Sequence, residues 1–178
     1  MAAVAGLPTK GGTMKTHGIA RGWALALVAS SLAACASVAD NRAPIVGDWK
    51  VLSYELEFQD TGERRAVFGK SPKGWIVLTR DGRAVSYLEA ENRKAPKTDE
   101  DRAAAFRSLV AYTGKYRVEA DRFITKVDGA WNVFWIGTEQ ARFFKVEGER
   151  LHITTQWGAA PVYDNRMVRG ILVCERER

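Results

Sequence analysis

Gln140 and Arg142 are the polar pair in this sequence with the clearest use in recognising a ligand, because they stand two residues apart in an aromatic-rich stretch. On an extended strand, side chains two residues apart share one face. That face also carries Phe134, Ile136 and Phe144. If it points into the protein, Arg142 is placed to fix a carboxylate by charge-assisted hydrogen bonds inside an apolar pocket. If it points to solvent, Arg142 is a solvated charge and Glu139 faces inward instead.

Aromatic side chains are plentiful enough to line a cavity. Together with Gln140 and Arg142, the predicted ligand-binding residues are Trp75, Tyr112, Tyr116, Phe134, Trp135 and Trp157. Such side chains are typical of pockets for planar or lipidic molecules, in which a few polar groups fix the orientation of the ligand. Each of them, taken singly, is equally consistent with an ordinary packed core. The function therefore depends on whether the interior is hollow or filled.

Motifs for catalysis are scarce. His152 is the only histidine after residue 34, and a lone histidine on a strand is more typical of a surface position than of a catalytic base. The sequence has no Gly-x-Ser-x-Gly, no Cys/His metal spacing and no glycine-rich phosphate loop. We therefore assign no catalytic residues, no metal and no cofactor. A cyclase or isomerase stays open as an alternative, since a tyrosine, Glu139 and Arg142 in a dry cavity would supply the one poised acid or base that such chemistry needs.

Residues 1–34 have the layout of a secretory signal peptide. They contain three basic residues and no acidic one, an apolar run over residues 23–29 and an exit of small residues. The apolar run is shorter than the roughly 20 residues that cross a bilayer as a helix. Translation from Met14 would give a leader of ordinary length, so Met14 is the expected start.

The end of this leader, Leu32-Ala33-Ala34-Cys35, resembles the lipobox of bacterial lipoproteins. The resemblance implies cleavage before Cys35 and acylation of its thiol, followed by a flexible tether over residues 36–44. Ala36 follows Cys35, and the absence of Asp at this position resembles lipoproteins sorted to the outer membrane, which predicts a periplasm-facing protein held on that membrane. The alternative is a simple secretory cleavage site with an incidental Cys35. If Cys35 is acylated, Cys174 has no disulfide partner and is either a buried thiol, as its apolar surroundings favour, or a reactive one.

The net charge of +6 does not indicate nucleic-acid binding. Three of the 27 basic residues lie within residues 1–34, which leaves 24 against all 21 acidic residues, a net charge of only +3. These charges are spread along the chain and form no basic block. A hydrophobic content of 46% is sufficient for one packed domain. The composition thus excludes wholesale disorder, argues against a nucleic-acid partner and leaves the oligomeric state open.

Short segments with period-two patterning recur from Ile45 onward and predict an all-β domain over residues 45–178. The predicted strands are 47–58, 65–68, 74–79, 83–89, 112–119, 122–127, 133–146 with a bend at Gly137, 150–156 and 166–175. Asp81-Gly82 between two of these strands is a strong hairpin signal. One amphipathic helix is predicted at about 99–110, with Thr98 as its cap. Such a run of antiparallel strands folds as a sandwich or as a closed barrel.

Several dispersed stretches of the sequence form a recognisable set: GDWKVLSY at 47–54, FGKSPKGWI at 68–76, DGR at 81–83, AYTGKY at 111–116, WIGTEQARF at 135–143 and the closing Glu175-Arg176. Together they resemble the bacterial lipocalin-like domain family. The resemblance covers about residues 46–176 and implies an antiparallel, eight- to nine-stranded lipocalin-like barrel. Cys174 stands where the family usually has Trp, and Lys126-Val127 stand where members often carry His. A histidine-based site therefore does not carry over.

The resemblance also implies a structural role for Gly47, Trp49 and Arg176. Lipocalins close one end of the barrel by laying an arginine from the last strand on the face of a tryptophan from the first. Such a cation–π contact contributes about 0.5–2 kcal/mol. We expect this group to hold the fold together and to take no part in chemistry.

These observations predict a lipid-anchored, lipocalin-like protein that binds a small apolar or amphipathic molecule in its barrel. Its expected partners are that ligand and, through the lipid anchor, the membrane. An enzyme that acts on an apolar substrate in the same cavity is the first alternative. A protein-interaction module with a filled barrel is the second.

Overall fold

The structure of the protein is a computed structural model that describes residues 41–177. The expected leader, Cys35 and most of the expected tether lie outside the described residues. All described residues belong to one compact unit. Within them, no helix is long and apolar enough to cross a membrane.

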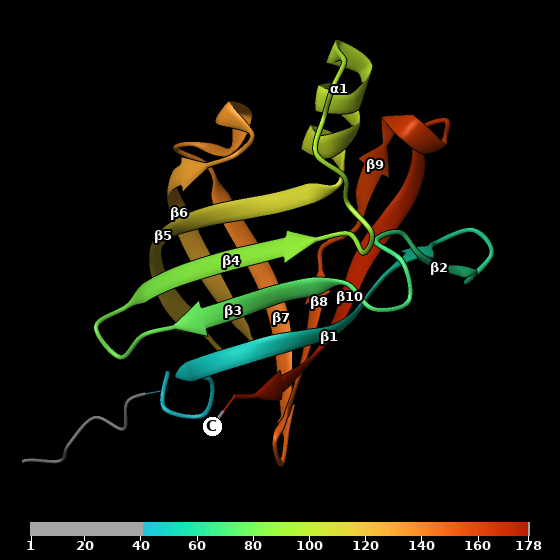
Figure 1. The fold of residues 1–178 in the computed structure, drawn as a ribbon. Coiled ribbons are helices and arrows are strands. Elements are labelled where there is room, and N and C mark those ends of the chain that lie inside the picture. Colours follow the sequence, from blue (N-terminus) through green and yellow to red (C-terminus); the bar gives the residue numbers. More distant parts are fainter. Residues whose placement is uncertain (1–40, 178) are drawn as a thin grey trace, which may run out of the picture. The chain divides into compact units, whose positions relative to one another are not determined.

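The described chain forms a closed antiparallel barrel of eight strands with two short additional strands (Figure 1). The strands are β1 (Gly47–Phe58), β2 (Arg64–Ala66), β3 (Lys73–Leu78), β4 (Arg83–Glu89), β5 (Leu109–Glu119), β6 (Arg122–Ala130), β7 (Glu139–Glu147), β8 (Arg150–Thr155), β9 (Gly158–Ala160) and β10 (Arg166–Arg176). β1 pairs with both β3 and β10, which closes the barrel, while β2 extends β1 and β9 extends β10. Closure leaves the barrel strands themselves without an open edge. The predicted all-β barrel with one helix is confirmed.

A β-bulge in β1 changes which of its side chains point into the barrel. The register of β1 against β10 shifts between Val51 and Ser53, so that Leu52 is an extra residue. Before the bulge Trp49 is fully buried, and after it Tyr54 lines the interior. Strict alternation would place Trp49 and Tyr54, five residues apart, on opposite faces of the strand; the bulge reverses the alternation, so both face inward.

The interior is packed toward the end of the barrel where β1 begins and β10 finishes. The buried cluster consists of Ile45, Trp49, Val51, Phe68, Ile76, Leu78, Ala84, Leu88, Tyr116, Phe123, Leu151, Ile153, Leu172 and Cys174. These residues come mainly from the inward-facing, alternate positions of the barrel strands, as the pleat requires. The core therefore fills one end of the barrel.

The other end carries the helical segments (Figure 1). The helix α1 (Asp99–Arg107) begins with a capping box, in which the Thr98 hydroxyl accepts from the Asp101 N–H and the Asp101 carboxylate accepts from the Thr98 N–H. No residue of α1 is buried. The helix is shorter than predicted, because Val110 belongs to β5, where it pairs with Leu88 of β4.

The expected long strand over residues 133–146 is wrong in its first part. Val133–Trp135 form a 3₁₀ turn, η1, whose start is capped by the Asn132 side chain accepting from the Phe134 N–H. Gly137 then adopts a φ of +82°, which favours glycine, and β7 begins only at Glu139. A second 3₁₀ turn, η2 (Pro161–Tyr163), joins β9 to β10 at the same end of the barrel. Two short turns and a helix thus surround this end.

Candidate functional site

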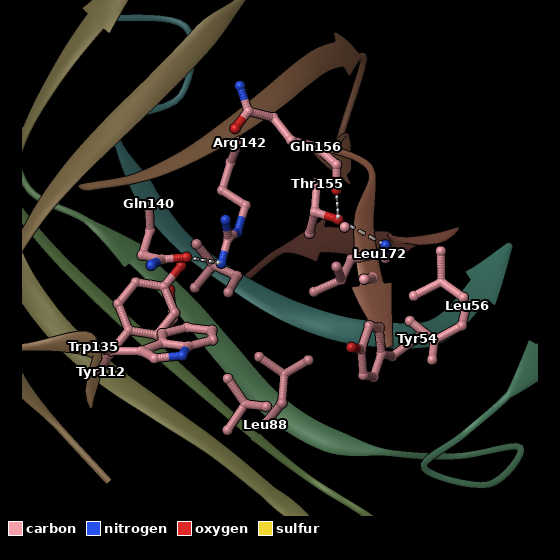
Figure 2. Close-up of a pocket in the computed structure, with 17 residues that line it drawn as sticks. Tyr54, Leu56, Leu88, Tyr112, Trp135, Gln140, Arg142, Thr155, Gln156 and Leu172 are labelled. Carbon is pink, nitrogen blue, oxygen red and sulfur yellow. Dashed lines mark hydrogen bonds between the residues drawn. The ribbon is translucent and has the colours of Figure 1, made fainter. Parts of the chain in front are cut away.

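The barrel contains a cavity of about 300 Å³ below the helical segments. Its walls come from seven strands of the barrel together with β9 and the η1 turn, so every side of the barrel except β6 contributes (Figure 2). This volume is at the lower end of the roughly 300–1,000 Å³ that is typical of ligand pockets. The barrel is therefore filled at one end and hollow at the other.

Most of the cavity wall is apolar. The aliphatic side chains that line it are Leu56, Ile76, Leu88, Val110, Val168 and Leu172. Ile76, Leu88 and Leu172 also belong to the buried core, so they separate the packed end from the hollow end. An apolar ligand that displaced water from this surface would gain roughly 25 cal/mol for each Å² of apolar area buried.

Gln140 and Arg142 point into this cavity from β7. Arg142 Nη2 donates to Gln140 Oε1 at 3.3 Å, and Arg142 Nη1 donates to the Ala141 carbonyl at 2.8 Å. The guanidinium carbon lies 5.6 Å from the ring centre of Tyr112 and 5.9 Å from that of Trp135. The two rings supply cation–π contacts that hold the cation at one side of the cavity (Figure 2). Of the two orientations left open by the sequence, the structure has the inward one.

Three hydroxyl groups of the wall are available to a ligand. Tyr54, Ser86 and Tyr112 line the cavity, and none of their hydroxyls hydrogen-bonds to another side chain or backbone group of the described residues. Burial raises the pKa of Tyr54 above its ordinary value, and the nearby positive charge of Arg142 opposes that rise only in part. Tyr54 therefore stays a neutral hydrogen-bond donor at physiological pH.

Four of the eight predicted ligand-binding residues line the cavity. Tyr112, Trp135, Gln140 and Arg142 come together there from β5, η1 and β7. Period-two spacing places Gln140 and Arg142 on one face, as expected. Trp135 reaches the cavity for a different reason, because the η1 turn folds it over the rim and against Tyr112, with ring centres 5.3 Å apart.

The other four predicted residues lie outside the cavity. Trp75 faces outward from β3 and donates its indole N–H to Glu177. Tyr116 is buried in the packed core, and its hydroxyl donates to the Thr79 carbonyl at 2.9 Å. The side chain of Phe134 is 85% exposed on the η1 turn. Trp157 does not line the cavity: it packs under the Arg169 guanidinium, 4.6 Å from the ring centre, in a second hollow that shares only Thr155 and Gln156 with the cavity.

Glu139 and His152 are also away from the cavity. Glu139 faces outward and accepts two hydrogen bonds from Arg117, which lower its pKa. His152 lies on the barrel exterior with its Nε2 3.3 Å from a Glu147 carboxylate oxygen. No group of His, Cys, Asp and Glu side chains within residues 41–177 is arranged to hold a metal ion. An acid–base mechanism that places Glu139 in the cavity is therefore excluded by its position.

The packed end is closed by Trp49 and Arg176. The Arg176 guanidinium carbon lies 4.0 Å from the Trp49 ring centre, and Arg176 Nη1 donates to the Val46 carbonyl at 2.8 Å. Trp49 Nε1 donates to the Ile45 carbonyl at 2.8 Å. Gly47 leaves the room that this stack needs, since a Cβ at that position would lie 2.6 Å from Arg176 Nη1. Gly47, Trp49 and Arg176 do not line the cavity, although Trp49 pairs with Ile76, which does.

Sequence reasoning missed several residues of the cavity, notably Tyr54, Ser86 and Thr155. Tyr54 is hidden by the bulge at Leu52, which the sequence does not reveal. Ser86 alternates with Leu88 on the inner face of β4, so strand periodicity was an available signal for it. Thr155 shapes the rim, because its hydroxyl accepts from the Gly170 N–H at 2.8 Å.

Comparison with known proteins agrees with this geometry. A search of curated proteins found no match. The family model described as the lipocalin-like domain matches residues 46–177, which is nearly all of the described chain. It matches the same span that carries the barrel, the closing stack and the cavity. The chain therefore belongs to the lipocalin-like domain family.

Proposed function

We propose that this protein is a lipid-anchored binding protein that holds a small apolar or amphipathic molecule in the cavity of its barrel. The observation that carries the proposal is the 300 Å³ cavity, whose wall is mainly aliphatic and aromatic but also contains Gln140 and Arg142. A mostly apolar hollow with a few convergent polar groups is the usual form of a small-molecule site. Membership of the lipocalin-like family supports the same function.

The cavity favours binding over catalysis. Its described lining contains neither a carboxyl group nor an imidazole, the groups that most often transfer protons in enzymes. The ionisable groups that remain are Arg142 and two phenols, and the pKa of Tyr54 is raised, which removes it further from proton transfer at neutral pH. The cavity also argues against a module that only binds other proteins, because a filled barrel was expected for that function.

Tryptophan fluorescence tests the proposed binding. Trp135 lines the cavity and contacts Trp131 with ring centres 5.0 Å apart, so a bound molecule should change the emission of both. We expect titration with a panel of lipids and aromatic compounds to give saturable quenching. Trp135→Phe should remove most of that signal, whereas the matched control Trp157→Phe, outside the cavity, should keep it. Absence of any saturable change across the panel, checked by calorimetry, would contradict the proposal.

The proposed anchor rests on the lipobox-like Leu32-Ala33-Ala34-Cys35 and is tested separately. We expect the protein expressed in a Gram-negative bacterium to appear in the outer-membrane fraction, facing the periplasm. Mass spectrometry of the mature N-terminus should show an acylated Cys35. Cys35→Ser should move the protein out of the membrane fraction, whereas Cys174→Ser should not. A soluble wild-type protein with an unmodified cysteine would overturn the anchor and leave the cavity proposal standing.

A further inference from the structure

Arg142 brings a positive charge into the cavity without a matching negative one. Every ion pair that the structure shows among residues 41–177 involves other side chains, and the cavity lining includes no Asp, Glu or Lys. Glu139, three residues earlier on the chain, turns outward to Arg117. A cation in an apolar, partly desolvated hollow is costly unless an opposite charge meets it. The positive charge of Arg142 therefore has no counter-charge among the residues that line the cavity.

The guanidinium also has unused hydrogen-bonding capacity. It carries five N–H donors, and the structure engages one on each Nη atom, with Ala141 and Gln140 as acceptors. Three donors remain for a ligand. Gln140 and the flanking rings of Tyr112 and Trp135 hold the group in place, so its planar fork is oriented before a ligand arrives.

The neutral polar groups of the wall add donors. Figure 2 shows Tyr54 on the side of the cavity opposite Trp135 and Gln140, with Arg142 extending into the space between them. The Tyr54 and Tyr112 hydroxyls have no hydrogen-bond acceptor among the described residues. A phenol hydroxyl donates readily to an anionic oxygen. The polar side of the cavity is thus matched to an acceptor that carries negative charge.

We propose that the ligand is a small amphipathic monocarboxylate whose carboxylate is bound by the Arg142 fork and whose apolar body lies against Leu56, Leu88 and Leu172. This inference rests on the proposed binding function and names its ligand class. One cation matches one negative charge, so a doubly charged phosphate monoester would keep an uncompensated charge in the cavity. The guanidinium geometry fits a carboxylate with two parallel hydrogen bonds. The volume of about 300 Å³ selects small molecules over diacyl lipids.

Matched pairs of compounds test the head group. We would measure by calorimetry the binding of decanoate against decanol, and of naphthoate against naphthalenemethanol, at neutral pH. Charge-assisted hydrogen bonds predict that the acid of at least one pair binds roughly tenfold to a hundredfold more tightly than its alcohol. Equal binding of acid and alcohol, or tighter binding of decylamine, would overturn the head-group inference while leaving the proposed function intact. Failure of all these compounds to bind would contradict the proposed function itself.

Variants then assign the preference to Arg142. Arg142→Gln should bring the acid-to-alcohol ratio to about one while the alcohol still binds, which shows that the cavity is intact. Arg142→Lys should keep part of the preference, since the charge remains but the planar fork is lost. Tyr54→Phe should reduce the preference by about tenfold or less, because it removes a single donor. The control is Arg117→Gln, which replaces an arginine of the outer face and should leave the acid-to-alcohol ratio unchanged. The assignment to Arg142 would be overturned if the preference for the acid survived in Arg142→Gln or disappeared in Arg117→Gln.

Discussion

Cys174 shows how environment decides the chemistry of a residue. Its side chain is fully buried in the core, and burial raises the pKa of its thiol to about 12. The thiolate is the reactive form of cysteine, and an unfolded chain has a thiol pKa of about 8.5. Of the two roles that the sequence left open for Cys174, the structure supports the inert buried thiol.

We predict that Cys174 reacts slowly with a thiol reagent in the native protein. In a Cys35→Ser background at pH 8, labelling should be on the order of a thousandfold slower than in denaturant, since the thiolate population differs by that order. The folded pKa lies above the unfolded one, so the thiol's contribution to stability is complete below about pH 8.5 and declines as pH rises further. The measurement is the labelling rate by mass spectrometry with and without denaturant. Similar rates in both conditions would show that the thiol is accessible in the folded state.

At the scale of the strand, β1 depends on one inserted residue. The bulge at Leu52 allows Trp49 to enter the packed core and Tyr54 to line the cavity on the same strand. A one-residue change of register moves every later side chain to the other face of a strand. The bulge therefore couples the stable end of the barrel to the ligand-binding end.

We predict that deletion of Leu52 costs far less than the roughly 3–5 kcal/mol lost when a buried aromatic side chain is removed. Without the extra residue, Trp49 and Tyr54 are four positions apart, so both still face inward and the pairing of β1 with β10 is continuous. Chemical denaturation followed by near-ultraviolet circular dichroism measures the change. The control is Trp49→Ala, which keeps the bulge but removes a fully buried aromatic side chain and should cost about 3–5 kcal/mol. A deletion variant as unstable as Trp49→Ala would show that β1 needs the bulge to keep its inward side chains in place.

Strand periodicity predicts where the strands of this protein lie better than it predicts which side chains of each strand point into the barrel. The Asp81-Gly82 turn, the β3–β4 hairpin and the shared face of Gln140 and Arg142 follow from local pattern alone, because hairpin turns and period-two alternation are local properties. That this face points inward does not follow from the pattern. The η1 turn and the bulge do not follow from it. Trp135 reaches the cavity because Asn132 caps a 3₁₀ turn and Gly137 redirects the chain, in a segment whose composition reads as a strand. The cavity itself depends on packing between strands far apart in sequence.

At the scale of the whole barrel, stability and binding are separated along its axis. The closing stack of Arg176 on Trp49 and the buried core occupy one end, whereas the cavity and its unpaired Arg142 occupy the other. Substitutions at the packed end should therefore lower stability, and conservative substitutions around the cavity should change affinity with little effect on stability. The exterior is held differently, by arginine–carboxylate pairs between neighbouring strands.

These exterior pairs predict a loss of stability in acid. Hydrogen bonds from Arg169 lower the pKa of Glu57, and hydrogen bonds from Arg166 lower the pKa of Asp60. A carboxyl group with a lowered folded pKa contributes stability above its unfolded value of roughly 4, and that contribution is lost as pH falls through the folded pKa. We expect the melting temperature at low salt to stay level between pH 7 and about pH 5 and to fall below it. High salt should weaken this contribution most at the Arg166–Asp60 pair, because the Asp60 side chain is more exposed than that of Glu57.

The control for this prediction removes a single pair. Asp60→Asn abolishes the charge that meets Arg166 across the β1 and β10 ends, where Arg166 also stacks on Phe58 with its guanidinium carbon 4.1 Å from the ring centre. In that variant the acid-dependent fall should be smaller than in the wild type, and the melting temperature at neutral pH should drop slightly. A melting temperature that is unchanged from pH 7 to pH 3 at low salt would show that these pairs contribute nothing to the fold. The barrel would then be stabilised by its packed end and its closed hydrogen-bonded sheet alone.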